Sequence, residues 1–123
     1  MLNHIVLVGR LANDPDMRYT NSGVPVARMT LAVSRGIKDK EGKNLVDFIP
    51  VVVWRKLAET CTNHLKKGMQ ACVEGRLETR TYEKGGKKQK VFEVLAERVY
   101  FLEWPKNDSI GEEVAYNPED IPF

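Results

Sequence analysis

Three aromatic residues are the side chains of this sequence with the clearest chemistry. Phe48 and Trp54 lie six residues apart in DFIPVVVW, so on a strand they would project from the same face. Tyr82 ends a second alternating stretch, MQACVEGRLETRTY. Exposed rings hold unpaired bases by stacking, worth about 1 to 3 kcal/mol per base, while Lys and Arg follow the phosphates. The pattern predicts a surface for a single-stranded nucleic acid.

Cations surround these rings in the sequence. Arg55 and Lys56 follow Trp54 directly, and Arg76 and Arg80 share the parity of Tyr82. The expected phosphate contacts are Arg10, Arg18, Arg35, Lys43, Arg55, Lys56, Arg76, Arg80, Lys84, Lys87 and Lys88. Alternatives remain open for each feature alone: the rings could be covered by a helix or a partner subunit, and the lysine-rich hairpin could be a solvated turn.

The charge of the chain is divided between a basic body and an acidic tail. Residues 105–123 hold one Lys against five Asp and Glu, whereas the other 104 residues of the 123 hold 18 Lys and Arg against 12 Asp and Glu. A basic body indicates a polyanionic partner. We expect one domain over residues 1–104 and a short, flexible acidic tail over 105–123.

The body has the period-2 alternation of β-strands. In VARMTLAVSR (26–35), Ala27, Met29, Leu31 and Val33 alternate with polar residues, as on a half-buried strand. Further strands are expected at 3–11, 45–54, 69–82 and 89–102. Gly9 and Gly75 lie inside these strands, where glycine marks a bulge or a sharp bend.

One helix interrupts the strands. Leu57, Cys61 and Leu65 recur every four residues, and Gly68 follows two lysines as an expected stop. Five strands with one short helix between the third and the fourth predict an all-β fold, a five-stranded OB-fold barrel, which binds oligonucleotides through its loops and one strand face. The turn-rich segment 14–25 is expected to be a connection.

Enzymatic chemistry is not indicated. The sequence has no phosphate-binding GxxxxGK[ST] motif and no GxSxG motif. His4, Cys61, His64 and Cys72 lack the spacing of a zinc site, so we expect no metal and no cofactor. The longest apolar run, VVVW, is far shorter than the roughly 20 residues of a membrane span. Two cysteines without a secretory signal indicate a cytoplasmic protein.

Five motifs in order resemble the bacterial single-stranded DNA-binding protein (SSB) family. They are NHIVLVGRLANDPDMRYTNSG, VARMTLAVSR, DFIPVVVWRKLAE, LKKGMQACVEGRLETRTYE and the terminal DIPF. The resemblance implies an OB-fold that assembles as a homotetramer and, associated with the nucleoid, wraps single-stranded DNA in replication, recombination and repair. It also assigns Phe48, Trp54 and Tyr82 to the principal stacking positions of the family.

The resemblance further implies that the tail tip recruits partner enzymes of replication, recombination and repair. The tip consists of Glu119, Asp120, Ile121, Pro122 and Phe123. Exposed apolar residues beside acids and the terminal carboxylate would fit a partner's apolar pocket with a basic rim.

Two positions depart from the family pattern. Ile37 stands where relatives often have a stacking tryptophan, and Pro50 lies in the middle of a strand, where it implies a bulge or an unpaired stretch. Two other readings stay open: a primosomal or ribosomal OB-fold module, and a scaffold that binds only proteins.

Overall fold

The computed structural model describes residues 1–102. The domain boundary expected at 104/105 and the tail tip lie outside this range. The described chain forms six strands and one helix, in the order β1 (Ile5–Leu11), β2 (Asp16–Tyr19), β3 (Pro25–Lys38), β4 (Asn44–Trp54), α1 (Arg55–His64), β5 (Gln70–Lys84) and β6 (Lys87–Phe101). The five predicted strands and the helix between the third and fourth of them are confirmed.

Five strands pair into a closed ring. β1 pairs antiparallel with both β3 and β5, β3 pairs with β4, and β5 pairs with β6. A short parallel contact between β4 and β6, at Val51–Val94 and Val52–Leu95, completes the circuit. Closure leaves the ring without an open edge, and the order of strands around it is that of an OB-fold.

β2 is a strand that the sequence does not predict. Segment 14–25, expected to be a connection, contains this four-residue strand, which pairs with β3 from Asp16–Arg28 to Tyr19–Pro25. β1 ends on the same strand at Leu11–Leu31, so β2 resumes along β3 where β1 leaves off. Four residues between turn signals carry too little alternation to be recognised; pairing with the long β3 decides their conformation.

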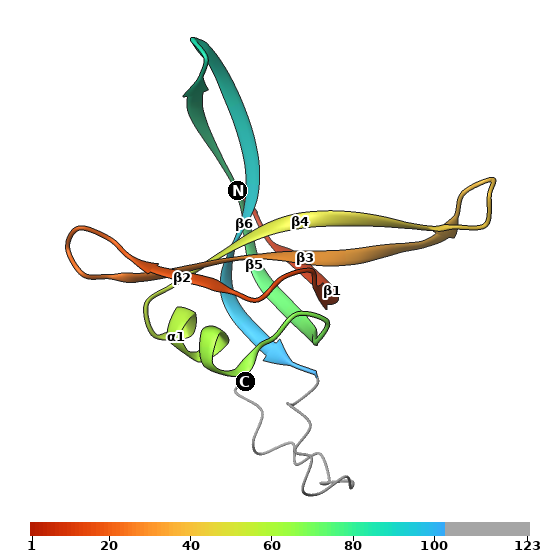
Figure 1. The fold of residues 1–123 in the computed structure, drawn as a ribbon, viewed down its shortest axis with the longest axis horizontal. Coiled ribbons are helices and arrows are strands. Elements are labelled where there is room, and N and C mark those ends of the chain that lie inside the picture. The colour runs from red at the N-terminus through yellow and green to blue at the C-terminus, as the bar shows by residue number, and fades with distance from the viewer. Residues whose placement is uncertain (103–123) are drawn as a thin grey trace, which may run out of the picture.

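The core follows the predicted parity. Ala27, Met29 and Leu31 of β3 are buried, and Val51 and Val53 of β4 join them. The ribbon shows α1 closing one end of the ring beside β2 (Figure 1).

Helix α1 packs Ala58 and Cys61 into the core, and Leu65, the residue that follows the helix, joins them. Burial raises the pKa of the Cys61 thiol to about 12, so at neutral pH it is a protonated apolar side chain, as expected from its place on the helix.

The helix ends earlier than predicted. Its last residue is His64, and the backbone N–H of Leu65 donates to the carbonyl of Cys61 at 2.8 Å. Gly68 does not stop the helix; it turns the connection to β5, with a φ of 90°, and its N–H donates to the carbonyl of Leu11 at 2.7 Å. Gly68 thus has the left-handed conformation typical of a glycine that ends a helix, but it lies four residues after His64, the last residue of α1.

Pro50 causes no bulge. The register between β3 and β4 is continuous from Ser34–Val46 to Val26–Trp54, and Pro50 pairs with Thr30 within it. The carbonyl of Thr30 accepts from the N–H of Ala12 at 2.8 Å, and its N–H donates to Asn13 Oδ1 at 3.0 Å. Both groups therefore point away from β4, so Thr30–Pro50 is a non-hydrogen-bonded pair and the missing N–H costs no ladder bond.

Two strand glycines sit where backbones meet. The register of β5 and β6 shifts between Glu74 and Gly75, which confirms the predicted bulge. A Cβ on Gly75 would collide with the carbonyl oxygen of Leu95, and one on Gly9 with that of Ala32. Glycine at these points lets β1 and β5 pass close to their neighbours while the sheet curves into a ring.

Three hairpins extend beyond the ring as arms (Figure 1). They are the β2–β3 hairpin, the β3–β4 arm (residues 34–47) and the β5–β6 arm (residues 78–93). Within residues 1–102 no helix is long and apolar enough to cross a membrane.

Replacing Gly75 by alanine tests the close approach. The new methyl group would meet a backbone carbonyl that cannot rotate away, so we expect Gly75→Ala to lower the free energy of unfolding by about 2 to 4 kcal/mol, measured by urea denaturation. Gly86→Ala is the control: Gly86 has a φ of 79° but open space around it, so it should lose only about 1 kcal/mol of left-handed strain. Equal losses would contradict the steric account.

Candidate nucleic-acid interface

The aromatic residues of β4 project from the outside of the ring. Val51 and Val53 are buried in the core, so the residues of even number face outward. Phe48 is 66% exposed and Trp54 is 41% exposed. Both rings are accessible, so α1 does not bury them, although Val52, between them on the same face, is only 4% exposed.

Cross-strand pairing carries this outer face over to the β5–β6 arm. Val52 pairs with Leu95 on β6, and Leu95 pairs with Arg76 on β5. Residues that pair directly lie on the same face of a sheet, and period 2 then places Arg80 and Tyr82 on that face as well. Tyr82 is 39% exposed. The three predicted rings thus share one continuous outer surface, here called the aromatic face.

Two predicted cations join the aromatic face from the opposite side. Arg18 on β2 and Trp54 on β4 flank the same residue of β3. Arg10 on β1 and Phe48 flank Ala32 in the same way. The guanidinium of Arg10, however, donates to the carbonyl of Gly68 at 2.9 Å, which directs it toward the turn before β5.

A nearly buried carboxylate organises the centre of the aromatic face. Glu93 is only 8% exposed. Its Oε2 lies 3.1 Å from Nη1 of Arg28, and its Oε1 lies 3.4 Å from Nε of Arg80. The guanidinium carbon of Arg80 lies 5.9 Å from the ring centroid of Tyr82, a cation–π distance. Glu93 therefore holds two arginines, one of them against a predicted stacking ring.

Arg28 and Glu93 were not predicted as site residues. The alternation of β3 marks Arg28 only as a residue of its polar side, and Glu93 is an acid, whereas a phosphate contact requires a cation. The ion pair between Arg28 and Glu93 joins β3 to β6 across 65 residues of sequence, so no pattern of neighbouring residues reveals it.

Exposed carboxylates hold other predicted cations. Arg35 and Asp47 form a bidentate pair at the base of the β3–β4 arm, with Nη2–Oδ1 at 2.8 Å and Nε–Oδ2 at 3.0 Å. The Arg35 hydrogen bonds hold the pKa of Asp47 below its ordinary value. Nε of Arg18 lies 3.3 Å from Oδ2 of Asp16, and Nη2 of Arg76 lies 3.4 Å from Oε2 of Glu78. Such solvated pairs are worth little, so these arginines can exchange carboxylate for phosphate at small cost.

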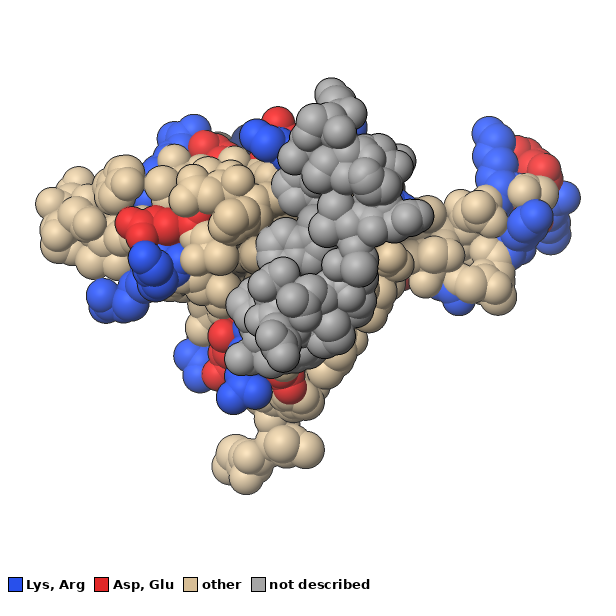
Figure 2. Space-filling model, turned by 90° about the horizontal axis from the view of Figure 1, so that it is seen from below, with Lys and Arg blue, Asp and Glu red and all other residues tan. Residues whose placement is uncertain are grey.

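Four of the five predicted lysines lie at the ends of the arms. Figure 2 shows basic side chains around the tip of the β3–β4 arm, at the right of the view, where Lys43 closes the loop by donating its N–H to Asp39 Oδ1 at 2.9 Å. Lys84 pairs with Lys87 at the tip of the β5–β6 arm, and Lys88 pairs with Glu83. These exposed cations lie beyond the rings on both arms.

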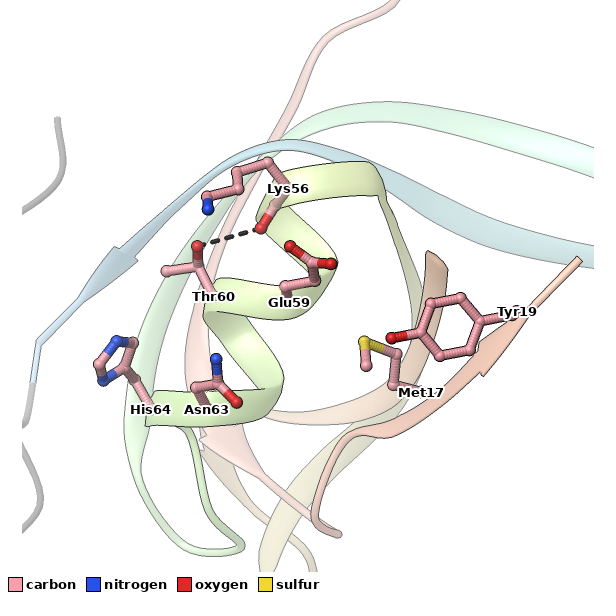
Figure 3. Close-up of a pocket in the computed structure, with 7 residues that line it drawn as sticks. All are labelled: Met17, Tyr19, Lys56, Glu59, Thr60, Asn63 and His64. Carbon is pink, nitrogen blue, oxygen red and sulfur yellow. Dashed lines mark hydrogen bonds between the residues drawn. The ribbon is translucent and has the colours of Figure 1, made fainter. Parts of the chain in front are cut away.

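The two cations after Trp54 belong to the helix. Arg55 begins α1 with a φ of 60°. Lys56 lines a pocket between α1 and β2 (Figure 3), whose other lining residues are Met17, Tyr19, Glu59, Thr60, Asn63 and His64. Their contribution to the aromatic face remains a prediction.

The candidate zinc ligands do not come together. Among residues 1–102, no three His, Cys, Asp or Glu side chains are placed to share a metal ion. Cys72 is half-buried, and burial followed by the charge of Glu74 raises the pKa of its thiol.

Comparison with known families identifies the relatives of this chain. The model of the single-strand binding protein family matches residues 2–102. The chain belongs to this family. The match spans the whole ring, α1 and all three arms, and it confirms the resemblance drawn from the motifs.

Three curated relatives are bacterial proteins. The chain is 51% identical over 120 residues to the "Single-stranded DNA-binding protein" of Bacillus cereus, covering 97% of this chain and 70% of that protein. It is 55% identical over 111 residues to "Single-stranded DNA-binding protein 2" of Listeria monocytogenes, covering 89% and 69%. It is 51% identical to "Single-stranded DNA-binding protein A" of Bacillus subtilis over 118 residues, covering 95% and 68%. These are names of binding proteins, in agreement with the expectation that the chain is not an enzyme.

A solved structure shares the fold. The "Plasmodium falciparum SSB complex with ssDNA" superposes with a TM-score of 0.75 at 27% identity, covering 84% of this chain and 96% of that one. The predicted OB-fold is confirmed.

Neutralising Glu93 tests its structural role. We expect Glu93→Gln to lower the free energy of unfolding by about 1 to 3 kcal/mol, because two guanidinium groups lose a shielded anion. Glu78→Gln is the matched control, since Glu78 pairs with Arg76 in the open and should cost less than about 1 kcal/mol. Thermal and urea unfolding measure both. A Glu93→Gln protein as stable as the control would show that this carboxylate is not a structural centre.

Proposed function

We propose that this protein binds single-stranded DNA, without sequence preference, along its aromatic face. The observation that carries the proposal is the exposure of Phe48, Trp54 and Tyr82 on one surface of the closed ring. Every base offers a π face to such rings, so stacking discriminates little between sequences. Phosphates would be held by the cations predicted above.

The geometry favours unpaired strands over duplex. Stacking on a protein ring needs a base face that is free, and a double helix keeps its bases stacked on one another. The rings also lie far apart: Phe48 and Trp54 are six residues apart on an extended strand, or about 20 Å. A flexible single strand can follow that spacing. The P. falciparum neighbour of the same fold is named as a complex with ssDNA, which supports the proposal.

The biological setting follows the family. We propose that the protein protects single strands during replication, recombination and repair in the cytoplasm and nucleoid, and that it acts as a homotetramer. Its partners would be enzymes of these processes, recruited by the tip residues Glu119, Asp120, Ile121, Pro122 and Phe123.

Removing a ring should weaken DNA binding. We expect Phe48→Ala or Tyr82→Ala to reduce affinity for poly(dT) by about 5- to 150-fold, because each loses about 1 to 3 kcal/mol of stacking. Quenching of tryptophan fluorescence, which comes from Trp54 and Trp104, measures binding during the titration, with duplex DNA giving a weak response. Log affinity should fall against log salt with a slope of about −0.7 per neutralised phosphate.

Val46→Ala is the matched control. Val46 is exposed on the same face of β4 as Phe48 but has no ring, so its loss should leave the affinity unchanged. Absence of binding by the unaltered protein would refute the proposal, and so would equal affinity for duplex and single strands. A protein-only scaffold would show no fluorescence response to poly(dT).

The tail tip should act separately from the aromatic face. We expect deletion of Phe123 to abolish capture of partner enzymes from cell extract, because the apolar end of the tip is lost, while affinity for poly(dT) is unchanged. Glu112→Gln, in the tail but outside the tip, is the control and should retain capture. Capture that survives the deletion would contradict a role for the tip. That result is expected of a primosomal or ribosomal OB-fold module, which needs no functional tip.

A further inference from the structure

The β5–β6 arm has a second face that the aromatic face does not use. Along β5 and β6, residues of core parity alternate with those facing outward. Val94 is buried in the core, but the arm continues past the core. The next residue of core parity, Phe92, is therefore 55% exposed, opposite Thr79 on the neighbouring strand. Lys90 follows, two residues further toward the tip, and Phe92 and Lys90 define the back face of the arm.

The back face repeats the chemistry of the aromatic face. Nζ of Lys90 lies 5.8 Å from the ring centroid of Phe92, and the guanidinium carbon of Arg80 lies 5.9 Å from that of Tyr82 on the opposite face. Each pair joins residues two apart on one strand. A cation beside an exposed ring is the combination that binds a base and its phosphate. One hairpin thus carries two such pairs on its two sides.

A strand of DNA can pass from one side of the arm to the other. The side chain of Asn3 extends β1 along β5 as far as Leu77, accepting from its N–H at 3.0 Å and donating to its carbonyl at 2.9 Å. Beyond this point, within the described residues, β5 pairs only with β6. The arm is a two-stranded ribbon standing away from the ring (Figure 1). Its β5 edge is open, and its side chains are exposed from Glu78 to Lys84 on β5 and at Phe92 on the back face.

We propose that Phe92 and Lys90 form a second platform for single-stranded DNA, which receives a strand that has crossed the β5 edge from Tyr82. This inference rests on the proposed function and adds a site to it. Charge favours nucleic acid over a second protein chain: residues 82–90 hold four lysines against one acid. The exposed apolar area on this side is also small. Among the described residues of β5 and β6, the exposed apolar side chains of core parity are Leu77 and Phe92, whose area is much less than a stable protein interface requires.

The test compares short and long oligo(dT) with the full chain. A short oligo(dT) occupies the aromatic face alone, whereas a long one reaches around the arm. We expect Phe92→Ala to weaken binding of long oligo(dT) by at least about fivefold and to leave short oligo(dT) unaffected. Phe92→Tyr should restore long binding because it keeps a ring. Lys90→Gln should reduce the salt slope for long oligo(dT) by about 0.7.

Thr79→Ala is the matched control, on the same face opposite Phe92 but without a ring. Thermal unfolding verifies that each variant is folded. If Phe92→Ala binds long oligo(dT) like the unaltered protein while Tyr82→Ala is weakened, the second platform is refuted and the proposed function stands. If the unaltered protein binds neither length, both fall. A change in sedimenting mass with unchanged DNA affinity would assign the back face to a second copy of the chain and overturn the inference.

Discussion

The parallel contact between β4 and β6 is the constraint on which the candidate site depends. Only two residue pairs, Val51–Val94 and Val52–Leu95, join these strands, yet they close the ring. They also bring the outer face of β4 beside that of β5, because Leu95 pairs with Arg76 across β6. Without this contact the rings of β4 and the ring of Tyr82 would belong to separate surfaces.

Alternation couples the core to the surface. Because Val51 and Val53 are buried, Phe48 and Trp54 face outward. The hydrophobic effect that fills the interior of the closed strand ring therefore also presents these aromatic side chains to solvent. The arms extend this logic past the core, where positions of core parity have nothing to pack against. Phe92 is exposed for that reason, and not because local sequence marks it as a surface residue.

The aromatic face carries carboxylates as well as basic side chains. Glu93 holds Arg28 and Arg80 in place, and Arg80 lies beside the ring of Tyr82, while Asp16, Asp47 and Glu78 pair with arginines in the open. The nearly buried carboxylate of Glu93 limits where the two guanidinium groups can lie. The exposed carboxylates contribute little energy, so their arginines stay available to other anions.

The sequence by itself determined the strands with long alternation, the single helix, the parity that places Phe48 and Trp54 on one face of β4, and the family, because these depend on residues that are neighbours in the chain. It misjudged β2, the end of α1 and the effect of Pro50. In each case a distant partner decided the outcome: β3 beside β2, Leu11 against the Gly68 turn, and Thr30 opposite Pro50. Tertiary structure alone decided the Arg28–Glu93–Arg80 cluster and the shared face of three rings, because hydrogen bonding between strands sets which distant residues become neighbours.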